Sequence, residues 1–102
     1  MAGTKFEKQG TTLKVCPKGR LDTATSPVLE KELSKYLDGI ENIVMDLADV
    51  EYISSGGIRM MLAIEQTLED RGGKLQVCHV NEYILEVFDL VGFMDVVEVL
   101  QD

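Results

Sequence analysis

The sequence predicts an α/β fold: a mixed β-sheet of four to five strands, opened by an N-terminal hairpin, with about three helices packed on it. Three observations predict this architecture. Short runs with strand-like patterning alternate along the chain with longer segments in which apolar residues recur at helical spacing. Strands separated by helices favour parallel pairing, whereas two adjacent strand-like runs at the start favour a hairpin. The 102 residues, without an internal repeat or linker, indicate a single domain over 1–102.

The hairpin is predicted from two short runs, residues 5–9 and 12–16, with a turn at Gly10. The second run alternates apolar and polar residues, as a half-buried strand requires. Pro17 and Gly19 then end this run or place a bulge in it.

The first helix is predicted to begin at Ser26, whose hydroxyl would cap it, with Pro27 at the first helical position. Apolar residues follow at helical spacing, and Gly39 closes the helix. The next run, residues 43–47, is nearly all apolar and rich in branched side chains. That pattern is typical of a central strand buried on both faces.

Three further elements and a short last strand follow the same logic. Their predicted extents are a helix over 56–71 closed by Gly72 and Gly73, a strand over 75–80, a helix from Asn81 to Gly92, and a strand within 96–99. In the first of these helices, Glu65, Glu69 and Asp70 are predicted to form a solvated acidic face.

The charge balance excludes several classes of partner. The chain has ten Lys and Arg residues and 18 Asp and Glu residues, which gives a net charge of −8. Such an acidic chain is a poor ligand for nucleic acid or for anionic membranes. Neither a secretion signal nor an apolar stretch of ~20 residues is present, so we expect a cytoplasmic protein without a membrane anchor.

The cysteine and histidine positions predict neither a metal site nor a cofactor. Cys16 and Cys78 are far apart in the sequence, and His79 is the single histidine of the chain. No metal-ligand spacing connects them, so they are interpreted as two reduced thiols and a histidine that pack on a sheet.

The segment most suggestive of function is residues 49–59, where the chain leaves a strand and enters a helix within about ten residues. Ser54, Ser55, Gly56 and Gly57 stand where the first helical N–H groups lack intrahelical acceptors. A phosphate there would meet free donors and the positive end of the helix dipole, and glycines would allow close approach. An ordinary serine cap is the plain alternative.

Five stretches together resemble the bacterial anti-sigma factor antagonists, which are single STAS domains. The matching stretches are residues 19–22 (GRLD), 43–47 (IVMDL), 52–59 (YISSGGIR), 72–75 (GGKL) and 87–93 (VFDLVGF). They cover almost the whole chain in order, so the resemblance is more specific than any one motif. It implies a STAS-like fold.

The resemblance also implies a partner-switching function rather than an enzymatic one. The unmodified domain would bind an anti-sigma factor, often an ATP-dependent serine kinase, and so release a sigma factor. The kinase would phosphorylate Ser55, which ends binding, and a phosphatase would restore it. Ser54, which stands where the family often has an acidic residue, is the alternative acceptor. Arg59 stands where many members have glycine.

The resemblance further implies a partner surface around the serine. The candidate residues are Asp22, Thr23, Thr25, Ser54, Ser55, Gly56, Gly57 and Arg59. Asp22 has an alternative structural role, because aspartate often accepts bonds from backbone N–H groups within a turn. Arg59 lies four residues after Ser55, so it could hold a phosphoserine, contact the partner, or simply be solvated.

Other functions predict different chemistry. A small phosphocarrier or enzyme subunit would relay a phosphoryl group through His79 or Cys78 and would form an acid-labile phosphohistidine or a phosphocysteine. An acyl carrier is disfavoured by the strand-like runs, since acyl carriers are helical. A serine hydrolase is disfavoured because the segment around Ser55 lacks the glycine that precedes a nucleophile elbow.

Overall fold

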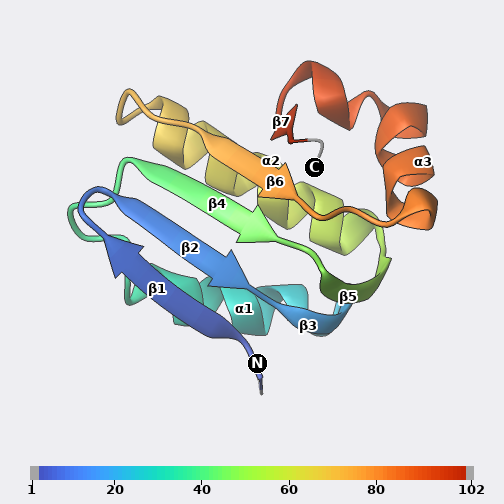
Figure 1. Ribbon diagram of the computed structural model, residues 1–102, viewed down its shortest axis with the longest axis horizontal. Coiled ribbons are helices and arrows are strands. Elements are labelled where there is room, and N and C mark those ends of the chain that lie inside the picture. The colour runs from blue at the N-terminus through green and yellow to red at the C-terminus, as the bar shows by residue number, and fades with distance from the viewer. Residues whose placement is uncertain (1–2, 101–102) are drawn as a thin grey trace.

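A computed structural model describes residues 3–100 and is shown in Figure 1. Within these residues, the main sheet has five strands in the order β1-β2-β4-β6-β7. The strands are β1 (Lys5–Gln9), β2 (Thr12–Cys16), β4 (Asn42–Asp46), β6 (Leu75–Cys78) and β7 (Glu98–Val99). Strands β1 and β2 are antiparallel, and the other pairs in this sheet are parallel. The predicted mixed sheet with an opening hairpin is thus confirmed.

The described residues also form several helices, of which only the first two cover a face of this sheet. They are α1 (Ser26–Ser34), α2 (Ser55–Glu69), α3 (Glu82–Val91) and the short 3-10 helix η1 (Phe93–Asp95). Figure 1 shows α1 and α2 behind the sheet and α3 beyond β6, so the face toward the viewer carries no helix among the described residues. None of these helices is both long and apolar enough to span a bilayer.

The core lies between the sheet and helices α1 and α2. Leu13, Met45 and Val77 are fully buried on the helix side of adjacent strands. Val44, which points to the opposite face of β4, is only half-buried. The prediction that residues 43–47 are buried on both faces is therefore wrong. Both covering helices pack on the same side, so only alternate residues enter the core.

A second, two-stranded sheet was not predicted. Strand β3 (Lys18–Leu21) pairs in parallel with β5 (Asp49–Ile53), and the register shifts between Gly19 and Arg20. Of the two alternatives for Pro17 and Gly19, the first holds, because β2 ends at Cys16. The register shift lies in the next strand, at Gly19, whose φ of +85° favours glycine. The chain does not stop pairing at Cys16 but enters a new strand. Because β5 ends at Ile53 and α2 begins at Ser55, this small sheet leads directly into α2.

Helix α1 differs from its prediction at both ends. Ser26 is the first helical residue rather than the cap, and its buried hydroxyl has no hydrogen-bond partner within residues 3–100. Among the described residues no side chain caps α1; the Asp22 Oδ1 instead accepts from the N–H groups of Ala24 and Thr25 in the turn that precedes the helix. The helix ends at Ser34, before the predicted end at Gly39. The apolar residues that continue at helical spacing after Ser34 lie in successive turns.

The later elements follow the predictions more closely. Helix α2 begins at Ser55, and α3 is capped by Asn81, whose Oδ1 accepts from the Ile84 N–H at 2.8 Å. Gly92, with a φ of +73°, ends α3 as expected. The strand predicted over 75–80 ends at Cys78, because His79 has a left-handed φ of +56° that breaks the extended backbone.

The C-terminal strand is shorter than the range 96–99, because η1 comes first. Phe93 opens η1 and is buried, with its ring centroid 4.1 Å from that of Phe88. This packing folds the chain into a helical turn before β7 pairs with β6. Helix η1 was not predicted from the sequence.

Glu65 is buried, with 6% of its surface exposed, so its predicted place on a solvated face is wrong. It lies four residues after the buried Met61 and therefore on the core-facing stripe of α2. Its Oε1 accepts from the N–H of Leu75 at the start of β6 at 2.8 Å. The carboxylate thus ties α2 to the sheet.

Replacing Glu65 by leucine is expected to lower the free energy of unfolding by about 1–3 kcal/mol, because the buried Leu75 N–H loses its acceptor. The exposed Glu69 provides a control, and Glu69→Leu should change stability by less than about 0.5 kcal/mol. Urea unfolding of both variants measures the difference. Equal stabilities would contradict this role of Glu65.

Candidate functional site

The two serines at the start of α2 have different environments. Ser54 is half-buried and extended, with φ −110° and ψ 179°, and its Oγ accepts from the Gly56 N–H at 3.2 Å. Ser55 is the first helical residue and is exposed, and its hydroxyl has no hydrogen-bond partner in the part of the chain that the structure describes. Ser54 therefore caps the helix, while the Ser55 hydroxyl points to solvent-accessible space and is available for chemistry.

The glycines that follow bring a loop against the start of α2. A Cβ atom on Gly57 would lie 2.6 Å from the carbonyl oxygen of Leu21, and one on Gly56 would lie 3.0 Å from Cα of Thr23. The N–H of Ser54 donates to the same Leu21 carbonyl at 2.9 Å. The close approach that these glycines permit is thus made by the loop between β3 and α1. Gly57 is buried beneath it, whereas Thr23 is exposed beside the serines.

Asp22 organises that loop. Its Oδ1 accepts from the Thr25 N–H at 2.9 Å and the Ala24 N–H at 3.0 Å, and the Thr25 hydroxyl accepts from the Asp22 N–H. The N–H of Thr25, more than any other group, holds the pKa of the Asp22 carboxyl below its usual range. The structural role considered for Asp22 is therefore present, and the loop it holds lies next to Gly56.

The lowered pKa of Asp22 predicts a loss of stability in acid. The carboxylate form is stabilised in the folded state, so its contribution is complete above the ordinary pKa of 3.8 and disappears as the pH falls through the lower folded value. Wild-type stability should therefore fall more steeply than that of Asp22→Asn between about pH 5 and about pH 3. Urea midpoints across this range test it, and parallel curves would contradict it.

Two arginines border the serine region. Arg59 is exposed on α2 and lines a groove with Thr23, Gly56 and the start of α1, and it has no ion pair within residues 3–100. Arg20, which the sequence did not predict as a site residue, is the second. Its guanidinium lies 4.2 Å from the ring centroid of Tyr52, and its Nε lies 3.4 Å from Oδ2 of Asp22.

The Arg20 side chain extends a surface that sequence reasoning missed. The ring of Tyr52 stacks on that of Tyr83 from α3, with centroids 6.2 Å apart. Tyr83 is 49% exposed, so the aromatic pair is open to a partner. Tyr52 lies on β5 and stands three residues before Ser55. That short separation was the one signal in the sequence for this surface.

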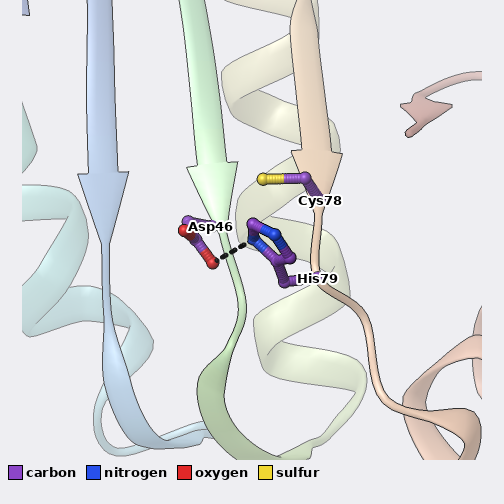
Figure 2. Close-up of side chains that lie close together, drawn as sticks. All are labelled: Asp46, Cys78 and His79. Atoms are coloured by element: carbon purple, nitrogen blue, oxygen red, sulfur yellow. Dashed lines mark hydrogen bonds and ion pairs between the residues drawn. The ribbon is translucent and has the colours of Figure 1, made fainter. Parts of the chain in front are cut away.

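Cys78 and His79 lie at the end of β6, on the face of the sheet that carries no helix, and Figure 2 shows them with Asp46 of β4. Nδ1 of His79 is 3.0 Å from Oδ1 of Asp46. The fold therefore pairs the single histidine with a carboxylate from the adjacent strand and brings the Cys78 thiol within 4.8 Å of both. Sequence spacing did not predict this group.

The fold and the serine region place the chain in a known class. The STAS domain family matches residues 4–102, so the chain belongs to that family. It is 34% identical over 89% of its length to BtrV of Bordetella bronchiseptica, a protein named as an anti-sigma factor antagonist, and covers 79% of that relative. The chain is thus a member of the anti-sigma factor antagonist family.

Solved structures agree on the fold. A Thermotoga maritima protein described as an anti-sigma factor antagonist superposes with a TM-score of 0.89 at 19% identity, over 99% of this chain and 87% of the other. The anti-sigma factor antagonist SpoIIAA in its unphosphorylated form gives a TM-score of 0.77 at 14% identity, over 98% and 89%. Its phosphorylated form, from Bacillus, gives 0.74 at 16% identity, over 96% and 91%.

Proposed function

We propose that this protein captures an anti-sigma factor that is also a serine kinase, and thereby releases a sigma factor. Phosphorylation of Ser55 by that kinase ends the capture, and a serine phosphatase restores it. The exchange takes place in the cytoplasm, where these partners meet. The relatives named as anti-sigma factor antagonists support the choice of partner, and the phosphorylated form of SpoIIAA supports this mode of regulation.

The observation that carries the proposal is the exposed hydroxyl of Ser55 at the start of α2. A kinase can reach this oxygen without unfolding the domain. The hydroxyl of Ser54 is instead engaged in the helix cap, which favours Ser55 over Ser54 as the phosphate acceptor.

Phosphorylation at this position suits a switch because the free and bound domains respond differently. The first N–H groups of α2 and the positive end of its dipole accommodate the ~1.5 to 2 negative charges that a phosphate adds. A partner that covers the same surface must desolvate that charge, which costs several kcal/mol without a cation nearby. A penalty of ~4 kcal/mol weakens binding about a thousandfold.

Arg59 completes the proposed surface. It is exposed and lies four residues after Ser55 on the same helix, within reach of a phosphate on that residue or of the bound partner. Thr23, Thr25 and Asp22 form the adjacent loop, whose position is fixed by the bonds of the Asp22 carboxylate.

The experiment combines the protein with the anti-sigma factor and sigma factor encoded in the same genome, and follows the complexes by size-exclusion chromatography. We expect a one-to-one complex of this protein with the anti-sigma factor, and a sigma factor that is no longer bound. Addition of ATP should dissociate this complex. The Ser55→Ala variant should capture its partner but no longer respond to ATP, while Ser54→Ala should respond like wild type. Failure to displace the sigma factor, or an unchanged ATP response in Ser55→Ala, would contradict the proposal.

A further inference from the structure

Three side chains that commonly bind metal ions meet at the ends of β4 and β6 (Figure 2). Asp46 and Cys78 are register partners in this parallel pair, so both side chains leave the same face of the sheet. His79 follows directly after β6. The Asp46 carboxylate oxygen, the Cys78 Sγ and a His79 ring nitrogen all lie within 4.8 Å of one another.

We propose that this group, the Asp46–Cys78–His79 cluster, binds a transition-metal ion such as Zn²⁺. Imidazole, thiolate and carboxylate are the ligands that zinc takes in proteins. Sulfur and nitrogen donors disfavour Mg²⁺ and Ca²⁺, which prefer oxygen. One thiolate and one carboxylate also balance the two positive charges of the ion, so binding leaves no net charge within the cluster.

The distances are close to those of a tetrahedral site. Two zinc ligands at 2.0–2.2 Å from the metal lie about 3.3 Å apart, and Nδ1 of His79 is 3.0 Å from Oδ1 of Asp46. A sulfur ligand at ~2.3 Å would lie about 3.5 Å from either atom. The sulfur must therefore move inward by at most about 1.3 Å, which side-chain rotations can supply. The His79 side chain is 46% exposed, which leaves room for a water ligand.

Neighbouring groups hold the Asp46 carboxylate in place. The Ala48 N–H donates to Oδ1 of Asp46 at 3.0 Å, and Lys14 Nζ lies 3.9 Å from Oδ2. Outer contacts of this kind orient metal ligands. His79 adopts a φ of +56°, which is uncommon for a residue other than glycine and costs ~1 kcal/mol or more. Figure 2 shows its ring directed toward Asp46 between the two strands.

Cys16 offers a matched control because it is the other cysteine of the chain and ends β2, the strand beside β4. Burial, and then the nearby Asp46 carboxylate, raise the pKa of its thiol. It is not part of the Asp46–Cys78–His79 cluster, whose atoms come from β4 and the end of β6. Replacing Cys16 should therefore leave metal binding unchanged.

The test titrates the untagged, reduced, metal-free protein with Co²⁺ and then with Zn²⁺. We expect a one-to-one Co²⁺ complex with a thiolate-to-cobalt charge-transfer absorption band, which Zn²⁺ abolishes. Loss of an outer contact alone lowers metal affinity about 10–100-fold, so Cys78→Ser and His79→Asn should lower it by about 100-fold or more. Asparagine is chosen because it tolerates the left-handed backbone of His79. The Cys16→Ser variant should bind as wild type does.

Two results would overturn the inference. One is the lack of a charge-transfer band in the wild-type protein at Co²⁺ concentrations in excess of the protein. The other is a band that survives Cys78→Ser or disappears in Cys16→Ser, since either would place the ligand sulfur elsewhere. Circular dichroism spectra of the variants show whether they remain folded. None of these readouts depends on the anti-sigma factor.

Discussion

Replacing Ser55 by aspartate is expected to weaken the complex with the anti-sigma factor by about a hundredfold or more, equivalent to about 3 kcal/mol. The new carboxylate remains stable in the free protein, because it lies at the positive end of α2. It must lose its hydration when the partner covers this surface, and that cost weakens binding. Isothermal titration calorimetry of the wild type and the variant measures the difference.

The neutral Ser55→Ala variant is the matched control. It removes the hydroxyl without adding charge, and Ser55 donates no hydrogen bond to residues 3–100, so affinity should stay within a few-fold of the wild type. If Ser55→Asp and Ser55→Ala bind equally well, charge exclusion is not the basis of the switch. If both lose binding, the hydroxyl itself is a contact.

Replacing Gly57 by alanine is expected to lower the free energy of unfolding by about 2–3 kcal/mol. The added methyl group would lie 2.6 Å from the Leu21 carbonyl oxygen and 2.9 Å from Cγ1 of Ile53, so backbone must move to accept it. Helix propensity alone predicts the opposite sign, since alanine stabilises a helix by about 1 kcal/mol relative to glycine. Urea unfolding therefore distinguishes the two effects by sign.

The neighbouring Gly56→Ala variant provides a comparison for this prediction. Its methyl group would lie 3.0 Å from Cα and Oγ1 of the exposed Thr23, a milder overlap than the 2.6 Å at Gly57. The loss of stability should therefore be smaller than in Gly57→Ala. A Gly57→Ala protein as stable as the wild type would contradict the close packing of the loop on α2.

The parts of the fold that could be predicted are those whose signals are local. The opening hairpin has a turn glycine between alternating runs, and α3 has a capping asparagine and a closing glycine. Strands β3 and β5 lack such signals, because each is short and its pairing partner is distant in the sequence. The prediction that Glu65 lies on a solvated face was wrong for a related reason. Its carboxylate can be buried because it accepts a hydrogen bond from the Leu75 N–H, which belongs to another element.

The candidate serine region was predictable because a helix start is itself a local feature. The sequence placed both serines at the start of α2, but only the structure separates the capping Ser54 from the exposed Ser55. The Asp46–Cys78–His79 cluster could not be found from spacing. Its members come from neighbouring parallel strands whose side chains meet only through their register.

The location of the phosphate tests the central claim most directly. The protein is incubated with the anti-sigma factor kinase and ATP, and the modified peptide is identified by mass spectrometry before and after acid treatment. The account predicts an acid-stable phosphate on Ser55. A phosphate on Ser54, an acid-labile phosphate on His79, a phosphate on Cys78, or an unmodified protein that still releases its partner would contradict it.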